Sequence, residues 1–398
     1  MSNLHAPAEI VTVGRVRLDL ATTLGEVNQV KGQGNEVKAA STISVCSNFV
    51  LKLCRFLTTT VDILLYLDHQ MGDESADTVI NGQKPLHIWT PLIESVPLSK
   101  HSGFIVHLKL DNNQPSSSFK IRGIGNLCQK AKSKGCKHIV CSSGGNAGLA
   151  AAYAARKLNL PCTVYVPTTT PESTHQKLRN EGSEVIVHGS VWNEANEMAM
   201  KAADQPGYAS VHPFDHPDVW DGHSSIIEEM AADMKKPDVV ITCVGGGGLL
   251  CGVVQGMKKV GWNDVPIIAM ETIGSDSYNS AVKAGKLVTL KEISSVAKSL
   301  GSLTVCQQAF DYYSQHPIIS ATVEDKEAVN ACLKFADDHR ILVEPACGAA
   351  IAAIYSHVIP RLQKEGKLKD VKSVALVVCG GASVNLSLLL NWKEQFGL

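Results

Sequence analysis

The chain has 398 residues, of which 44% are hydrophobic and 19% are charged, and its formal net charge is −1. This is the composition of a globular protein with room for more than one domain. The near-zero charge gives no electrostatic reason to expect nucleic acid or a membrane surface as a partner.

Residues 1–83 carry the weakest pattern. An apolar-rich stretch at residues 43–67 is interrupted by Lys52, Arg55 and Asp62, which argue against a membrane span. We expect either an amphipathic helix that packs on the main body or a partly disordered extension of unknown role. Its boundary is predicted near residues 81–83.

The cysteines and the start of the chain indicate the compartment. Twelve cysteines are scattered without a C-x-x-C pair, so we expect reduced core residues rather than a disulfide framework. The first residues lack the compact form of a secretory signal, and acidic residues there argue against a transit peptide. A cytoplasmic protein is therefore expected.

From Pro85 onward, short apolar runs alternate with amphipathic stretches. This alternation predicts an α/β fold with mostly parallel sheets covered by helices on both faces. The predicted strands are residues 104–110, 138–141, 163–166, 184–187, 239–244, 267–270 and 374–379. The clearest predicted helices are residues 147–158, 192–203, 219–234, 249–260, 326–337 and 346–362.

Lys120 follows a loop of small hydroxyl residues and one aromatic residue, Phe119. Pro115 disfavours helix before it, and the serines are good caps for a helix that starts just after them. Lys120 is then expected in the first turn, where the helix dipole and desolvation beside Phe119 favour a neutral amine. Such an amine can form a Schiff base with an aldehyde. Taken alone, the same pattern also fits a surface lysine at a helix start.

Four consecutive glycines, Gly245 to Gly248, follow a predicted strand and precede a predicted helix. Their N–H groups can converge on an anion, and a phosphate is the natural ligand. The register excludes the G-x-G-x-x-G dinucleotide fingerprint, and the absence of G-K-[ST] excludes a nucleotide P-loop. A tight turn that merely requires positive φ is the alternative.

A second turn, residues 142–148, also follows a predicted strand. Ser143 and Asn146 offer a hydroxyl and an amide at a helix start, which suits a carboxylate, and Asn146 can also donate to a phenolic oxygen. Capping and turn formation are common alternatives for these residue types. A third strand runs into Cys379 and two glycines. An imine-forming lysine, a phosphate cradle and a carboxylate cradle together indicate pyridoxal 5′-phosphate with an amino-acid substrate.

Five motifs resemble one known family: residues 118–123, 141–148, 244–252, 269–272 and 343–348. Together they are similar to the animal L-serine dehydratase/L-threonine dehydratase group of tryptophan-synthase-β-like, fold type II pyridoxal phosphate enzymes. The resemblance covers about residue 85 to the C-terminus. It implies two open twisted α/β domains with the cofactor in the cleft between them. We place the large domain at 84–114 and 218–398 and the small substrate domain at 115–217.

The resemblance also implies roles for individual residues. Lys120 is the lysine that holds the cofactor, and the cofactor ring lies between Phe119 and Ser299. Gly245, Gly246, Gly247 and Gly248 surround the phosphate, Asn146 meets the phenolic oxygen, and Cys379 faces the ring nitrogen. The substrate positions are Ser143, Gly144, Asn146 and Ala147. A monovalent-cation site, for K+ for example, corresponds to Gly245, Glu271, Ser275, Leu300 and Ser302.

The chain departs from the family pattern in two places. Position 144 is Gly where liver-type members have Ala, so we expect a larger pocket beside the substrate and a modest effect on selectivity, about 1–3 kcal/mol. The segment from Cys379 to Asn385 is one residue longer than the usual form, which leaves the placement of Ala382 and Ser383 open.

The resemblance implies elimination of ammonia from L-serine and L-threonine, in amino-acid catabolism and gluconeogenesis, by a homodimer. A racemase or a β-replacing synthase on the same fold remains an alternative, since Ser299 has a suitable place for a second acid or base. A protein that only binds the cofactor or an amino acid is a third interpretation.

Overall fold

The computed structural model describes residues 12–13, 16–17 and 84–398. The chain forms two compact units, residues 1–76 and residues 77–398. In the first unit the described residues form an antiparallel pair of short strands, β1 (Thr12–Val13) and β2 (Val16–Arg17). The predicted apolar stretch at 43–67 and the predicted boundary at 81–83 lie outside the described residues.

The second unit contains a six-stranded sheet with the order β11-β10-β9-β12-β4-β3. Neighbouring strands are parallel, except that the edge strand β3 runs antiparallel to β4. The bounds are β3 (Leu92–Glu94), β4 (Ile105–Lys109), β9 (Val239–Cys243), β10 (Ile267–Thr272), β11 (Ile318–Val323) and β12 (Ser373–Val377). Every residue of β9 and β10 is buried, as expected for strands covered on both faces.

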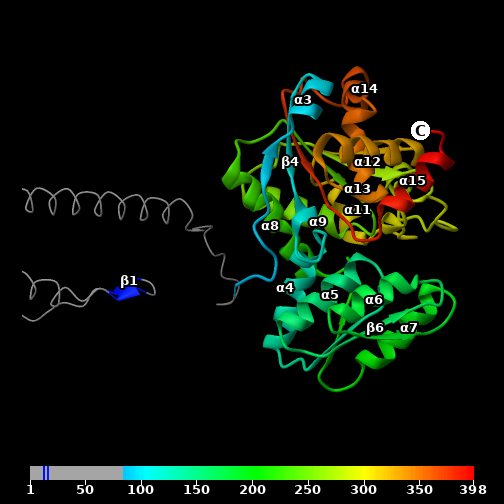
Figure 1. Ribbon diagram of the computed structural model, residues 1–398. Coiled ribbons are helices and arrows are strands. Elements are labelled where there is room, and N and C mark those ends of the chain that lie inside the picture. Colours follow the sequence, from blue (N-terminus) through cyan, green and yellow to red (C-terminus); the bar gives the residue numbers. More distant parts are fainter. Residues whose placement is uncertain (1–11, 14–15, 18–83) are drawn as a thin grey trace, which may run out of the picture. The chain divides into compact units, whose positions relative to one another are not determined.

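A four-stranded parallel sheet has the order β7-β6-β5-β8. Its strands are β5 (His138–Cys141), β6 (Cys162–Val166), β7 (Glu184–Val187) and β8 (Tyr208–Val211). In Figure 1, β6 lies in the lower part of the second unit with α4 (Lys120–Ser133), α5 (Asn146–Lys157), α6 (Glu172–Asn180) and α7 (Trp192–Ala203).

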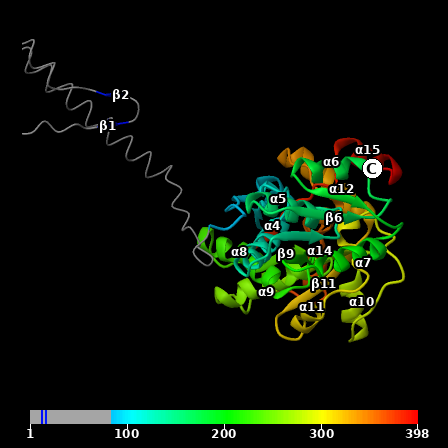
Figure 2. The ribbon, with the colours of Figure 1, turned by 90° about the horizontal axis from the view of Figure 1, so that it is seen from below.

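The remaining helices lie with the six-stranded sheet. They are α3 (Val96–Ser102), α8 (Pro217–Asp233), α9 (Gly248–Lys259), α10 (Ser277–Ala284), α11 (Gln307–Tyr312), α12 (Asp325–His339), α13 (Pro345–Tyr355), α14 (Val358–Lys364) and α15 (Leu386–Gln395), with 3-10 turns at Asp111–Asn113 and Lys298–Leu300. All residues of α13 are buried, because this alanine-rich helix packs on β9 and β10 and on α12. Helix α15 contacts α12 near the C-terminus (Figures 1 and 2).

The predicted α/β fold with parallel sheets is confirmed, and all seven predicted strands are present within one or two residues at either end. One helix prediction is wrong: residues 346–362 form two helices, α13 and α14, because His357 adopts a left-handed conformation with φ 53°. Strands β1, β2, β3, β8 and β11 were not predicted. The division into domains at residues 114 and 217 stays a prediction.

The cysteines in the described part of the chain agree with the expectation of reduced thiols. Ten are present there, all are free, and all but Cys136 are buried. Across residues 84–398, no helix combines the length and the apolar character needed to cross a bilayer.

Candidate active site

Lys120 is the first residue of α4, as predicted, and Phe119 is the N-cap. No side chain caps this helix, so the predicted capping by the preceding serines is wrong. The serine loop instead bonds through its backbone. Gly381 N donates to Ser117 O at 2.8 Å, and Phe119 N donates to Cys379 O at 3.1 Å. The start of α4 is therefore joined to the segment that follows β12.

The amine of Lys120 is partly buried and donates to the carbonyl of Pro213 at 2.6 Å. Burial lowers the pKa of Lys120 to about 8, against a smaller opposite effect of nearby cysteines and Glu344. The lowered pKa was predicted and is confirmed in direction. A substantial neutral fraction near pH 8 makes this amine a nucleophile and a base.

Phe119 is buried beside this lysine. Its ring packs on the imidazole of His223 with the ring centroids 4.9 Å apart. The Nδ1 atom of His223 in turn accepts from Gly123 N at 3.2 Å. Helix α8 therefore supports the phenyl ring from one side, and a contact of Phe119 with a cofactor ring stays a prediction.

The turn from Gly245 to Gly248 links β9 to α9, which begins at Gly248. Only Gly247 has positive φ among the four, at 96°. A Cβ on Gly246 would lie 2.3 Å from the ring of Phe214, and one on Gly247 would lie 2.6 Å from Ala309 Cβ. Positive φ thus favours glycine at position 247, and close packing leaves no room for a side chain at positions 246 and 247. The N–H groups at the start of α9 remain suited to an anion.

The turn before α5 is just as tight. Asn146 begins the helix, and Ser143 Oγ accepts from Gly145 N at 3.2 Å. A Cβ on Gly148 would lie only 1.8 Å from Ser143 O, so the close approach of the turn to the helix requires glycine there. Ser143 and Ala147 lie on this turn with Asn146, as the predicted carboxylate cradle requires.

The space beside Gly144 is filled in this structure. A Cβ at this position would lie 2.9 Å from Thr170 Cγ2 and 3.2 Å from Val166 Cγ1. The expected enlargement of the pocket by a missing methyl group is therefore offset by the methyl group of Thr170.

Glu344 was not predicted as a site residue, although it lies in one of the motifs. The residue is 2% exposed, and its carboxyl accepts from Asn146 Nδ2 at 2.8 Å and from the hydroxyl of Ser383. Burial raises the pKa of Glu344, while hydrogen bonds from Ser383, Ser299 and Asn146 oppose that rise. In the sequence, the sign that could have pointed to Glu344 is its place as a single acidic residue between the apolar run 341–343 and the proline that starts α13.

The predicted residues form one connected group. A Cβ on Gly245 would lie 3.2 Å from Ser299 O. Ala382 N donates to Asn146 Oδ1 at 2.9 Å. The contacts of Ala382 and Cys379 connect the Asn146 turn to the start of α4, and residues 213–214 contact both Lys120 and the glycine turn. They also place Ala382 and Ser383, whose positions were left open.

Cys379 lies beside a second thiol. The Sγ atoms of Cys379 and Cys243 are 3.5 Å apart, and both residues are buried. Hydrogen bonding with Cys243 and Cys347 and burial raise the pKa of Cys379 well above its usual range. This side chain is therefore a neutral thiol, which is a weak hydrogen-bond donor.

Glu271 occupies a fully buried position at the end of β10. Its carboxylate accepts from Tyr278 N at 2.9 Å and from Asn279 N at 2.7 Å, and burial raises its pKa to about 8. Buried side-chain oxygens without a hydrogen-bond partner lie close by in sequence: Ser275 Oγ, Ser277 Oγ, Tyr278 OH and Asn279 Oδ1. Val244 N donates to Met270 O, so Gly245 and Glu271 follow on neighbouring strands.

No cluster of three or more His, Cys, Asp or Glu side chains suited to a metal occurs in residues 84–398.

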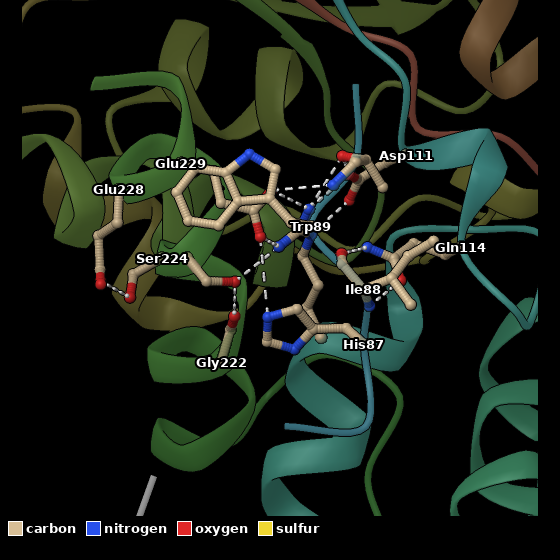
Figure 3. Close-up of polar contacts among 12 residues, drawn as sticks. His87, Ile88, Trp89, Asp111, Gln114, Gly222, Ser224, Glu228 and Glu229 are labelled. Carbon is tan, nitrogen blue, oxygen red and sulfur yellow. Dashed lines mark hydrogen bonds and ion pairs between the residues drawn. The ribbon is translucent and has the colours of Figure 1, made fainter. Parts of the chain in front are cut away.

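A buried group of charges lies two residues beyond Lys120. Arg122 is fully buried and bonds to both carboxylate oxygens of Asp111, at 2.7 and 2.8 Å, and to those of Glu229, at 2.5 and 2.8 Å. The Nζ of Lys109 lies 2.6 Å from Glu229. Figure 3 shows Asp111 and Glu229 facing each other across this group, with His87 at its edge. The first turn of α4 is thereby joined to β4 and α8.

A cavity of about 680 Å³ borders the same loops. Its lining includes residues of the serine loop, of α6 and of the segment after Cys379: Ser116, Ser117, Lys177, Asn180, Gly381 and Ala382. Since Ala382 also donates to Asn146, the wall of this cavity is the backbone that orients the Asn146 amide.

Comparisons with known proteins agree with this geometry. The family described as pyridoxal-phosphate dependent enzyme matches residues 84–380. The L-serine dehydratase/L-threonine deaminase of Bos taurus is 55% identical over 318 residues, 79% of this chain and 97% of the bovine protein. The serine dehydratase-like protein of Homo sapiens is 53% identical over 317 residues, 79% of this chain and 96% of that protein.

Two solved structures share the fold. An L-serine ammonia-lyase from the fungus Rhizomucor miehei gives a TM-score of 0.74 at 36% identity, covering 78% of this chain and 99% of that one. Threonine deaminase isoform 2 from Solanum lycopersicum gives 0.70 at 27% identity, covering 78% and 84%. The chain therefore belongs to the pyridoxal-phosphate-dependent enzymes of fold type II and, within them, to the L-serine dehydratase/L-threonine deaminase family.

Proposed function

We propose that this protein is an ammonia-lyase that converts L-serine to pyruvate and ammonia, and L-threonine to 2-oxobutyrate and ammonia, with pyridoxal phosphate held by Lys120. The observation that carries this proposal is the partly buried amine of Lys120, whose pKa is lowered to about 8. The names of the bovine and fungal relatives support the same reaction.

The residues present fit the cofactor. The glycine turn leaves no room for side chains and offers N–H groups at the start of α9 to a phosphate. The amide of Asn146 uses one N–H for Glu344 and its oxygen for Ala382, which leaves the second N–H for the phenolic oxygen. We place the cofactor in a cleft between the parts built on the two sheets, 84–114 with 218–398 and 115–217, with its ring between Phe119 and Ser299.

Pyridoxal phosphate supplies an aldehyde for the substrate amine and withdraws electrons from the α-carbon. The released amine of Lys120 is the base that takes the α-proton, and its lowered pKa suits that role. Cys379 would face the ring nitrogen as a neutral thiol. A thiol does not hold a proton on that nitrogen, which favours prompt loss of the β-hydroxyl over return of the proton.

The substrate carboxylate is assigned to the turn before α5. The hydroxyl of Ser143 and the N–H groups of Asn146 and Ala147 at the helix start suit an anion, and Gly144 lies beside them. This assignment uses the same short turn that Gly148 allows to close on the helix.

We also propose a monovalent cation, such as K+, bound by Gly245, Glu271, Ser275, Leu300 and Ser302. The unpaired buried oxygens near Glu271 and the adjacent strand ends of Gly245 and Glu271 support this site. Replacing K+ in the buffer by tetramethylammonium, which is too large for a buried site, should lower the rate of ammonia release. An unchanged rate would contradict the cation site.

The direct test of the function is a substrate panel on the purified full chain. Ammonia and the matching keto acid should form from L-serine and L-threonine in equal amounts. D-serine as the main product would instead support a racemase, and cofactor binding without turnover would support a binding protein. We further propose a cytoplasmic homodimer that acts in amino-acid catabolism and gluconeogenesis; size-exclusion chromatography with light scattering tests the dimer.

A further inference from the structure

Glu344 is the N-cap residue of α13, yet its side chain makes no capping bond to that helix. It turns instead toward the segments that carry the predicted cofactor contacts. Asn146 Nδ2 donates to it at 2.8 Å, and the hydroxyl of Ser383 donates as well. One buried carboxyl therefore meets both Asn146 and Ser383, which come from different parts of the chain.

The surroundings of Glu344 consist of hydrogen-bond donors. Both of these bonds are donated to the carboxyl, which acts as the acceptor in each. A buried carboxyl that accepts from two distant parts of the chain is more than a space-filling residue.

The loop after Cys379 is shaped around the same carboxyl. Gly381 has φ 127°, and a Cβ there would lie 2.1 Å from Glu344 Oε2. The next residue, Ala382, donates to Asn146 Oδ1 at 2.9 Å. Glu344 and Ala382 thus hold opposite ends of one amide group, so the Asn146 side chain has a single orientation with one Nδ2 hydrogen unused.

We propose that Glu344 is a positioning residue of this site: it holds the Asn146 amide so that its free N–H meets the phenolic oxygen of the cofactor, and it ties Ser383, in the segment after Cys379, to the same amide. This proposal rests on the proposed function, since it names the cofactor that Asn146 meets. Glu344 acts through Asn146 and needs no contact with substrate.

The test compares Glu344→Gln, Glu344→Ala, Asn146→Ala and the double variant Glu344→Ala/Asn146→Ala. The readouts are the dissociation constant for pyridoxal phosphate, the position of the visible absorbance band of the bound cofactor, and the thermal midpoint of each protein. Glu324→Gln is the matched control, because Glu324 is also an N-cap glutamate, on the neighbouring helix α12 and outside the site.

Each single variant at 344 or 146 should weaken cofactor affinity about 10- to 100-fold, as expected for loss of one charge-assisted hydrogen bond. Each should shift the absorbance band in the same direction, because the band reports the ionisation of the phenolic oxygen. The double variant should lose about as much affinity as Asn146→Ala alone, since Glu344 acts through Asn146 and both changes remove the same contact. Glu344→Gln fills the same volume, so it keeps the comparison valid if Glu344→Ala unfolds.

Unaltered affinity and an unaltered band in Glu344→Gln would overturn the proposal, as would losses that multiply in the double variant. A lower thermal midpoint with a normal band would assign Glu344 a structural role only and would also overturn it. Failure of the unaltered chain to bind the cofactor would contradict the proposed function itself and the role of Glu344 with it.

Discussion

The amine of Lys120 lies 2.6 Å from the carbonyl oxygen of Pro213, on the loop that also places Phe214 against the glycine turn. One short segment, residues 213–214, therefore contacts both the reactive amine and the predicted phosphate cradle. This relationship connects the two parts of the site that the sequence places 125 residues apart, at positions 120 and 245.

Replacing Lys120 with alanine should abolish ammonia release. The loss should be at least about 10²–10⁴-fold, because a general base alone contributes that much and the lysine also holds the cofactor. The measurement is ammonia formed from L-serine at saturating cofactor, with circular dichroism to confirm folding. Full turnover by Lys120→Ala would contradict the assignment of Lys120 as the base and as the lysine that holds the cofactor.

The rate at which the cofactor-free protein takes up pyridoxal phosphate should depend on pH through Lys120. The neutral amine is the reactive form, and its pKa is lowered to about 8, so the rate should rise about tenfold per unit below pH 8 and level off above it. Stopped-flow absorbance checks this, with Nα-acetyl-lysine as the control of ordinary pKa. A protein rate that keeps rising to pH 10 alongside the control would contradict the lowered pKa.

Replacing Arg122 with methionine should destabilise the protein by about 3–5 kcal/mol, because Asp111 and Glu229 would remain buried and lose their main partner. Urea unfolding measures this change. Lys236→Met removes an exposed ion pair with Asp264 and serves as the control, which should leave the urea concentration at half-unfolding unchanged. If Arg122→Met and Lys236→Met unfold at the same urea concentration, the buried charges do not anchor α4.

Gly144→Ala should change the ratio of kcat/KM for threonine over serine by about tenfold, in line with the value of one methyl group in a pocket. The new Cβ would lie 2.9 Å from Thr170 Cγ2, so Thr170 must shift. The double variant Gly144→Ala/Thr170→Ser removes that methyl and should restore the original ratio. If the ratio of kcat/KM for threonine over serine stays altered in the double variant, the contact with the methyl group of Thr170 is not the cause of the change.

Much of the fold could be predicted because strands and helices here follow local periodicity. Strands β5 and β7 and helix α7 have the predicted bounds. The strands β3, β8 and β11 were missed, because β3 has only three residues and β8 and β11 are partly buried with polar residues among the apolar ones. The edge strand β7 was predicted because it carries three consecutive β-branched apolar residues. The break between α13 and α14 was missed because the left-handed His357 leaves no mark in the apolar pattern.

The site could be predicted where a short motif carries it and not where distant segments meet. Lys120, Asn146 and the glycine turn lie in local patterns that suggest a helix start or an anion cradle. The bond between Asn146 and Glu344 joins residues 198 positions apart, so no local pattern reveals it. The absence of a serine cap on α4 has the same origin, because the backbone of residues 379–381 binds the loop from another part of the chain.

The most direct measurement is mass spectrometry of the purified protein after borohydride reduction and proteolysis. The account predicts a pyridoxyl group on the peptide that contains Lys120, and on that lysine alone. A pyridoxyl group on a different lysine, or none on a protein that still releases ammonia from serine, would contradict it.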